Sequence, residues 1–386
     1  MKKRFLRDIA EIQTGPFGSQ LHKEDYVDVG TPIVTVEHLG NRVFSEQNLP
    51  MVSDADKSRL SKYILRKGDI VFSRVGSVDR CSFVDKKHDG WMFSGRCLRV
   101  RPSEEIDSLF LYYFFCLNAT KEFVRSIAVG ATMPSINTKL LGEVEVLCPE
   151  IEEQRKIADI LSKIDDKIEE NQKINENLEQ QALALFTNFY DQSNTEVNFT
   201  DLIQILGGGT PKTGESTYWN GGIPFFTPKD VGTPYTLATE KTITEDGLSH
   251  CNSRLYPVNT VFVTARGTVG KIGLAGVPMA MNQSCYALSG KNIHQLLVYF
   301  YTLKAVDRLK HKASGAVFDA IITRDFETEQ VFKLSEDDTN TFIKNAEPMY
   351  QSILNNSVEN QRLIALRNSL LPKLMSGEID VSNIDI

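Results

Sequence analysis

The segment from residue 151 to 190 carries two interleaved series of mostly apolar side chains with a seven-residue period, and it contains neither glycine nor proline. One series begins at Ile157 and the other at Leu161. This spacing predicts one long helix with the seam of a coiled coil, whose pairing residues are Ile157, Leu161, Ile164, Ile168, Asn171 and Leu178.

A poorer copy of this seam follows about 189 residues later and predicts a second helix that pairs through Ile353, Asn360, Ile364 and Leu371. Asn171 and Asn360 occupy the same seam position, where a buried asparagine disfavours other registers. The alternative is two separately docked amphipathic helices whose asparagines face solvent. Pro348 either begins the second helix, where its missing N–H is harmless, or kinks a longer one.

The remaining segments show short β-rich runs, such as residues 70–72 and 260–263, broken by clusters of Gly, Pro and Asn. Each segment also has one or two helical stretches. The predicted fold class is therefore α/β, with two globular domains at residues 1–149 and 193–335 and helical segments at residues 150–192 and 336–386.

The two globular segments are copies of one unit. Pro32–Thr35 returns as Pro224–Thr227, and the strand and turn at Val71–Val78 return as Phe262–Val269. An offset of about 190 residues, doubled, nearly accounts for the whole chain of 386 residues. The pattern therefore predicts a pseudo-repeat in which each α/β domain is followed by a long helix.

Composition and charge narrow the class of protein. The chain is 41% hydrophobic, which excludes wholesale disorder, and its net charge is −7. The acidity is concentrated: residues 150–192 hold five Lys/Arg and eleven Asp/Glu, and residues 336–386 hold four and eight. The globular domains are therefore close to neutral, and their charge does not argue against a polyanionic partner.

The apolar run Leu109–Leu117 is about half the length that a membrane-spanning helix needs, and the first residues lack the apolar stretch of a signal peptide. We therefore expect a cytoplasmic protein without a membrane partner. The six cysteines are far apart and form no Cys-x-x-Cys pair, so no metal site and no disulfide framework is predicted.

No catalytic constellation is evident. Gly207–Thr213 ends in Lys-Thr like a phosphate-binding loop, but Pro211 stands where that motif requires glycine. The Asn/Asp-Pro-Pro-Tyr/Phe run of adenine methyltransferases is missing, and so is their Phe-x-Gly-x-Gly cofactor loop. The sequence therefore predicts a binding protein without a catalytic site or a cofactor of its own.

Two stretches resemble the DNA-specificity subunit of type I restriction-modification systems. Arg362–Ile379 (RLIALRNSLLPKLMSGEI) looks like the carboxyl-terminal ending of that family, and Pro149–Leu161 is similar to the opening of its central spacer. The order of domain, helix, domain, helix is also the order of the family. The second copy departs from the pattern, because Ser335–Asp338 replaces the Pro-x-x-x-x-Gln opening of the first.

The resemblance implies that residues 1–149 and 193–335 are target-recognition domains, each recognising one half of a split double-stranded DNA target, while antiparallel helices set the gap. It also implies that two methyltransferase subunits dock on the helices and that motor-nuclease subunits join for cleavage. The methyl donor and ATP would then be bound by these partners.

The side-chain chemistry of the turns identifies candidate DNA contacts. In each domain a buried strand leads into a turn that contains glycine, with cations and hydroxyls close together. Arginine can bind guanine in bidentate fashion, amides suit adenine, and Ser, Thr and Lys more often hold phosphate. The candidates are Ser73, Arg74, Ser77, Arg80 and His38 in the first domain, and Lys229, Thr264, Arg266, Thr268, Lys271, Asn282 and Gln283 in the second.

Each of these residues has a simpler interpretation, in which the glycines permit a turn and the charges are only solvated. At the level of the whole chain, one alternative is a coiled-coil scaffold that joins proteins without binding DNA. The other is a catalytic chain with an unrecognised site. Salt-sensitive DNA binding with a sequence preference distinguishes DNA recognition from the scaffold.

Overall fold

The computed structural model describes residues 2–16, 18, 20–232, 234–312, 320–382 and 384. The chain divides into two compact units. Unit 1 comprises Met1–Asp166 and Leu363–Ile386, and unit 2 comprises Lys167–Arg362. Each unit therefore combines one globular segment with parts of both long helices.

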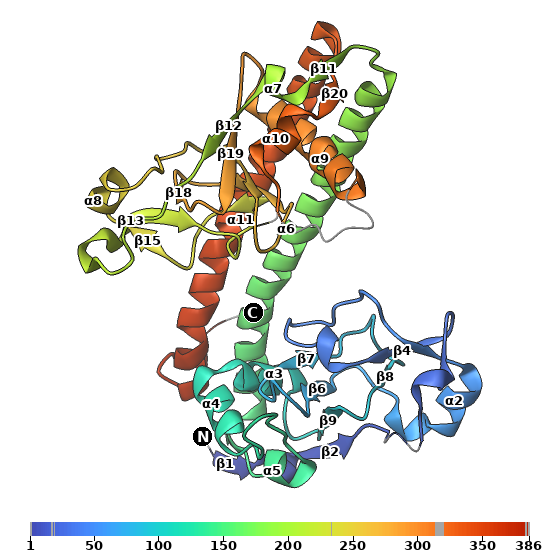
Figure 1. Cartoon of the computed structure of the whole chain (residues 1–386). Helices are drawn as coiled ribbons and strands as arrows, with labels where there is room; N and C mark the ends of the chain where they lie inside the picture. The colour runs from blue at the N-terminus through green and yellow to red at the C-terminus, as the bar shows by residue number, and fades with distance from the viewer. Residues whose placement is uncertain are drawn as a thin grey trace. The chain divides into compact units, whose positions relative to one another are not determined.

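The two long helices are α6 (Ile151–Gln192) and α11 (Glu336–Ser376) (Figure 1). Helix α11 begins after Ser335, whose Oγ accepts a hydrogen bond from the backbone N–H of Asp338 at 3.1 Å. It ends at Ser376, directly before Gly377, which has the left-handed φ of +76° that favours glycine. Pro348 therefore lies inside a continuous helix and does not begin it.

In unit 1, one sheet has the strand order β2-β9-β6-β7 and another has the order β3-β5-β4-β8, while β1 pairs with β10. The strands are β1 (Lys2–Phe5), β2 (Ala10–Thr14), β3 (Tyr26–Val27), β4 (Thr31–Val34), β5 (Met51–Val52), β6 (Ile70–Ser73), β7 (Cys81–Phe83), β8 (Met92–Phe93), β9 (Cys97–Pro102) and β10 (Glu145–Cys148). The shorter helices are α1 (Leu6–Ile9), α2 (Asp54–Arg59), α3 (Ser108–Cys116), α4 (Asn118–Ser126) and α5 (Thr138–Gly142).

The core of unit 1 is built around α3, which contains the longest apolar run of the sequence. Asp107 caps this helix by accepting hydrogen bonds from the N–H groups of Leu109 and Phe110 at 3.0 and 2.8 Å. A helix that is apolar on all sides has to be buried. It packs in one cluster with the strand side chains of β6 and β9 and with residues of both long helices, namely Ile157, Leu161, Leu371 and Leu374.

Unit 2 repeats this plan. Its larger sheet has the order β12-β19-β16-β17-β14, a second has the order β15-β13-β18, and β11 pairs with β20. The strands are β11 (Glu196–Asn198), β12 (Ile203–Gly207), β13 (Trp219–Phe226), β14 (Tyr235–Thr236), β15 (Thr242–Ile243), β16 (Val261–Thr264), β17 (Ile272–Ala275), β18 (Ala280–Met281), β19 (Cys285–Gly290) and β20 (Gln330–Phe332). The shorter helices are α7 (Phe199–Leu202), α8 (Glu245–Ser249), α9 (Gln295–Lys312) and α10 (Thr323–Glu327).

The strand order of the main sheet is the same in both units over four strands, which confirms the predicted pseudo-repeat. The first four strands of the larger sheet of unit 2 correspond one by one to β2, β9, β6 and β7 of unit 1. Unit 2 also buries its aromatic helix, α9, in a core with side chains of both long helices, including Phe186, Phe342 and Tyr350. The predicted α/β fold with two long helices is therefore present.

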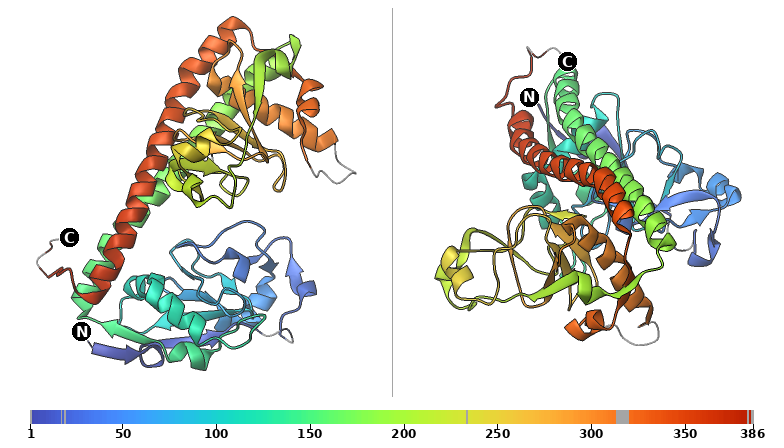
Figure 2. Two further views of the ribbon diagram at one scale, coloured as in Figure 1. Left: turned by 60° about the vertical axis from the view of Figure 1, so that its left-hand side comes forward. Right: turned by 90° about the horizontal axis from the view of Figure 1, so that it is seen from above.

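The long helices pair in antiparallel fashion, and views from two further directions show them side by side (Figure 2). In unit 2, Asn171 donates through Nδ2 to Oδ1 of Asn360 at 2.9 Å and to Oε2 of Glu359 at 2.7 Å. One turn further along α6, Asn175 accepts a hydrogen bond from Asn356 at 2.8 Å. Asn171 and Asn360 are only 1% and 8% exposed, which contradicts the alternative in which they face solvent.

Most predicted pairing residues lie inside the unit cores or between the helices. Buried positions are Ile157, Leu161, Ile168, Asn171, Ile353, Asn360 and Leu371, and half-buried ones are Ile164 and Leu178. The prediction for Ile364 is wrong, because its side chain is 39% exposed. In unit 1, the helices make contact near this residue through an ion pair instead: Arg367 donates to the buried Asp165 at 2.7 Å.

Within the described residues, no helix combines the length and the apolar character that crossing a membrane would require.

Candidate nucleic-acid interface

Unit 2 contains a cleft of about 520 Å³ formed by three loops. These loops follow β13, β16 and β18, and a fourth segment precedes β15. Figure 1 labels three of these strands, β13, β15 and β18. The lining residues are Thr227, Pro228, Lys229, Glu240, Lys241, Arg266, Gly267, Thr268, Asn282 and Ser284. Four residues predicted from the sequence, at positions 229, 266, 268 and 282, therefore meet in one place.

The first wall of the cleft is the turn after β13. Thr227 donates to Oδ2 of Asp230 through its backbone N–H at 2.8 Å and through its hydroxyl at 2.6 Å. The other oxygen of Asp230 accepts the backbone N–H of Glu240 at 2.7 Å. Asp230 therefore fixes the turn and joins it to the segment before β15, which leaves the side chain of Lys229 82% exposed.

The second wall is the turn after β16. Gly267 has a φ of +82°, a left-handed conformation that favours glycine. Thr264 is fully buried, and its Oγ1 accepts the backbone N–H of Lys271 at 2.9 Å, which closes the turn. Thr268 donates to the carbonyl of Pro228 at 3.2 Å and so ties this wall to the first. Arg266 stands exposed between these fixed points.

Asn282 stands in the loop that follows β18 and is held by its backbone. Its N–H donates to the carbonyl of Phe226 at 2.9 Å, and its Oδ1 accepts the N–H of Ser284 at 3.0 Å. Gln283 is exposed and accepts a hydrogen bond from Thr210, but it does not line the cleft, and neither does Lys271.

The charge of the cleft is positive. Among the described residues that line the cleft, Lys229, Lys241 and Arg266 are cationic and one, Glu240, is acidic; its Oε2 lies 3.9 Å from Nζ of Lys229. Both members of this pair are well exposed, so their attraction is weak. Among the described residues, Arg266 has no carboxylate partner within ion-pair distance. Nζ of Lys241 lies 5.7 Å from the ring centroid of Trp219. Such a cleft can attract a phosphate backbone.

Unit 1 has the equivalent turn at residues 73–80, with Gly76 at a φ of +75°. The backbone N–H of Ser73 donates to the carbonyl of Arg80 at 2.9 Å, as Thr264 does to Lys271 in unit 2. Arg74 donates to the carbonyl of Gly95 at 3.1 Å, and Arg80 donates to the carbonyl of Leu39. Ser77 is exposed at the tip of the turn.

Three predicted DNA contacts are wrong because their side chains are buried in structural roles. Ser73 is 2% exposed and donates to the carbonyl of Val75 at 2.8 Å. Thr264 closes the matching turn of unit 2. His38 is 4% exposed, and its Nδ1 accepts the N–H of Thr35 at 3.0 Å, so Nε2 carries the proton that is donated to the carbonyl of Gln47 at 3.1 Å. His38 therefore fixes its turn in unit 1 by the same backbone hydrogen bond with which Asp230 fixes the equivalent turn in unit 2.

Sequence reasoning missed one cation and one carboxylate that come from the far side of the cleft. Glu240 and Lys241 lie before a strand of two residues, with no glycine turn to mark them. Two hydrogen bonds hold this segment beside the turn after β13: Asp230 accepts the backbone N–H of Glu240 at 2.7 Å, and the carbonyl of Lys241 accepts the N–H of Phe225 at 3.0 Å. Two segments that are distant along the chain and meet only in the fold leave no signal in the local sequence.

Within the described part of the chain, no group of three or more His, Cys, Asp or Glu side chains is arranged to hold a metal ion. The six cysteines are free thiols. Burial raises the pKa of the thiols of Cys97 and Cys285 to about 12, so both stay protonated at neutral pH.

Together, the fold and the cleft define an internally repeated α/β protein with paired long helices and a cationic binding surface. A profile of the family described as "Type I restriction modification DNA specificity domain" matches residues 1–180 and 192–332. The chain belongs to this family.

Individual relatives agree with the assignment. The chain is 23% identical to the type I restriction enzyme MjaIX specificity subunit of Methanocaldococcus jannaschii, over 98% of this chain and 93% of that protein. It is 24% identical to the HindI specificity subunit of Haemophilus influenzae, over 83% of this chain and 88% of that protein. The crystal structure of a type I restriction-modification S subunit from M. genitalium shares the fold, with a TM-score of 0.64 at 16% identity, over 97% and 95% of the two chains.

Proposed function

We propose that the chain recognises a bipartite double-stranded DNA target, with one half-site bound by each unit, and directs methyltransferase and restriction subunits to it. The observation that carries this proposal is the cleft of unit 2, where three cations, hydroxyls and an amide converge on loops that hydrogen bonds between side chains and backbone hold in place. Family membership supports the same conclusion for the whole chain.

The side chains of the cleft divide by chemistry. Lys229, Lys241 and the hydroxyl of Thr268 suit phosphate oxygens, which position a protein on the duplex. Arg266 can donate two parallel hydrogen bonds to O6 and N7 of guanine, and the amide of Asn282 can pair with adenine. The rigid turns matter because a side chain that is held in place before binding loses less entropy on contact.

In unit 1 the corresponding contacts are the exposed Ser77 and Arg80 and the partly exposed Arg74. Each arginine already donates to a backbone carbonyl, and arginine has further N–H donors. These two residues can therefore bind phosphate while they hold the loops of unit 1 together.

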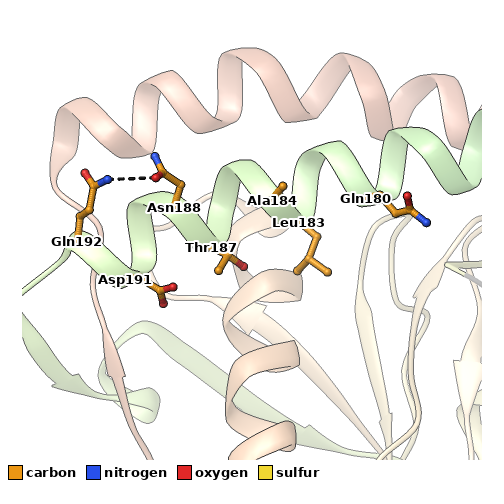
Figure 3. A pocket seen from close by; sticks show the side chains of 7 residues that line it. All are labelled: Gln180, Leu183, Ala184, Thr187, Asn188, Asp191 and Gln192. Atoms are coloured by element: carbon orange, nitrogen blue, oxygen red, sulfur yellow. Dashed lines mark hydrogen bonds between the residues drawn. The ribbon is translucent and has the colours of Figure 1, made fainter.

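The partners that we propose are two methyltransferase subunits on the paired helices and motor-nuclease subunits for cleavage. Methylation, cleavage and the binding of the methyl donor and ATP would reside in these partners, and the chain itself would carry no catalytic site. One candidate docking surface is a shallow hollow of about 590 Å³ on α6. Figure 3 shows Leu183, Thr187 and Asp191 on one side of the helix, with Asn188 and Gln192 joined by a hydrogen bond of 3.1 Å.

This surface suits a protein partner. Leu183 is 43% exposed, and Ala184 beside it is exposed as well, so apolar area remains to be covered. The surrounding Gln180, Asn188 and Asp191 supply a polar rim without positive charge. An acidic and partly apolar helix face repels DNA and favours contact with another protein.

The test is DNA binding by the full-length chain, measured by fluorescence anisotropy on a random duplex pool between about 50 and 200 mM salt. Wild type should bind with an affinity that falls steeply as salt rises. The triple variant Lys229→Ala, Lys241→Ala and Arg266→Ala should bind more weakly and with a shallower salt slope. Lys173→Ala removes an exposed cation from α6 and serves as the matched control, with wild-type binding.

Equal salt slopes for wild type and the triple variant would show that the cleft does not contact phosphate. Absence of salt-dependent binding by wild type would favour the scaffold alternative.

A further inference from the structure

The loops that surround the cleft of unit 2 have the same backbone hydrogen bonds as loops of unit 1. Arg74 N donates to Arg96 O at 2.8 Å, as Ala265 N does to Ser284 O at 2.8 Å. Ser94 N donates to Val34 O at 2.9 Å, matching Asn282 N and Phe226 O at 2.9 Å. Likewise Ile136 N donates to Arg74 O, and Ile321 N to Ala265 O, both at 2.9 Å. These bonds define equivalent positions residue by residue.

The side chains at these positions differ between the units. Lys229, Arg266 and Asn282 of unit 2 correspond to Glu37, Val75 and Ser94 of unit 1, and Lys241 corresponds to Pro50, since their carbonyls accept from Phe225 and Ile33 respectively. In the opposite direction, Ser284 of unit 2 corresponds to Arg96. One cation of unit 1, Arg96, therefore stands at a position where unit 2 has a serine.

We propose that Arg96 is the residue through which unit 1 selects guanine in its half-site. The proposal rests on the proposed function of the chain as a DNA-recognition subunit. It adds a specificity-determining residue that neither the glycine turn nor the repeat identified in the sequence.

The position of Arg96 suits contact with a base. Its counterpart Ser284 lines the cleft and is half-buried, whereas Lys229 at the rim is 82% exposed. A side chain at the deeper position reaches base edges once the rim meets the phosphates. Among the described residues, the guanidinium of Arg96 has neither an ion-pair partner nor a hydrogen-bond partner, so its donors are available for O6 and N7 of guanine.

The backbone on both sides of Arg96 is fixed. Gly95 accepts a hydrogen bond from Nη1 of Arg74 at 3.1 Å, and Cys97 N donates to Ser94 O at 2.9 Å. Glu37, at the position of Lys229, is exposed and would repel a phosphate there. Unit 1 therefore lacks the phosphate contact that Lys229 offers in unit 2 and has to bind DNA through other cations. Arg96 is one of these, and it is exposed beside the turn.

The experiment is selection of bound sequences from a fully randomised duplex library by the full-length chain, followed by sequencing. We compare wild type with Arg96→Ser, which installs the side chain of unit 2, and Arg96→Lys, which keeps the charge but not the fork of donors. Wild type should require guanine at one position of one half-site. Both variants should lose that requirement by about 5- to 150-fold, the range that corresponds to ~1 to 3 kcal/mol per bidentate contact.

The second half-site should remain unchanged in both variants, and thermal melting should match wild type because the side chain is exposed. Uniform weakening on all sequences, with the base preference intact, would mark Arg96 as a phosphate contact and overturn the proposal. An unchanged preference in Arg96→Ser would overturn it as well. If wild type itself selected no sequence, the proposed function would fail instead, and the two failures are therefore distinguishable.

Discussion

The buried amide pair between the long helices gives a quantitative prediction about stability. In unit 2, Nδ2 of Asn171 donates to Asn360 at 2.9 Å and to Glu359 at 2.7 Å, while Nδ2 of Asn360 donates to the carbonyl of Ile168 at 3.4 Å. The two asparagines are thus not equivalent. Asn171 serves two acceptors, one of them charged, and Asn360 supplies one of those acceptors.

Replacing one partner leaves the other unsatisfied. Asn171→Leu removes the donor for the buried oxygen of Asn360 and for Glu359, and we expect a loss of about 2 kcal/mol in the free energy of unfolding. Asn360→Leu leaves Asn171 bonded to Glu359 and should cost about 1 kcal/mol. The double variant places two leucines in contact and removes both amides of the pair, so it should lie within about 1 kcal/mol of wild type. The coupling is therefore at least about 2 kcal/mol.

The assay is urea unfolding followed by tryptophan fluorescence. The chain has two tryptophans, Trp91 in unit 1 and Trp219 in unit 2. A Trp91→Phe background makes Trp219 the sole reporter of the unit that holds the asparagine pair. Additive single-variant losses in the double variant, or a smaller loss for Asn171→Leu than for Asn360→Leu, would refute the reasoning.

Three further predictions follow from separate features. Burial, and to a smaller extent the charge of Glu176, raises the pKa of Glu179 from 4.5 to about 7. The ionised carboxylate therefore destabilises the fold above about pH 7, and this cost fades as the pH falls towards 4.5. Glu179→Gln should raise the free energy of unfolding by about 1 kcal/mol at pH 8 and leave it unchanged at pH 4.5, whereas an equal gain at both pH values would contradict this explanation. Heptads inserted after Asp166 and after Arg362, at the borders of the units, keep the Asp165–Arg367 and Asn171–Asn360 pairs, so the protein should fold. Each heptad adds about 10 Å of helix, close to three base pairs and about 100° of DNA rotation, so methylation of the parental target should stop. Unchanged methylation would show that the helices do not set the gap between the half-sites. Leu183→Glu should weaken co-purification with the methyltransferase at least tenfold while DNA binding stays intact. Val29→Glu, a change at an 87% exposed valine, is the control and should co-purify like wild type. Co-purification of Leu183→Glu at the level of wild type would show that the methyltransferase docks elsewhere.

The long helices were the most predictable part of the fold. The seven-residue period depends only on side chains that must be buried, and α6 begins within one residue of the predicted segment at 150–192. The period could not reveal where polar pairs replace apolar contacts. The buried Asp165 binds Arg367 from the other helix, and Ile364 is exposed, because each outcome depends on a partner that is distant in sequence.

The binding site was less predictable, for a reason that His38 and Asp230 illustrate. They have different chemistry, yet both accept the N–H of a threonine three residues earlier and fix the same turn. Hydroxyls beside a glycine turn were ambiguous in the same way, since Ser73 and Thr264 close the turns and Thr268 lines the cleft. Charged residues near a turn are visible in sequence, but whether they face a cleft is decided by loops paired across the unit.

We infer that the two units of the chain recognise the two halves of a split DNA target. Sequencing of methylated DNA from cells that carry the chain together with its methyltransferase partner tests this inference. We predict one motif made of two short specific blocks at a constant gap, and Arg266→Ala should change only one block. A single uninterrupted motif, or changes in both blocks, would show that the two units do not each recognise one half-site.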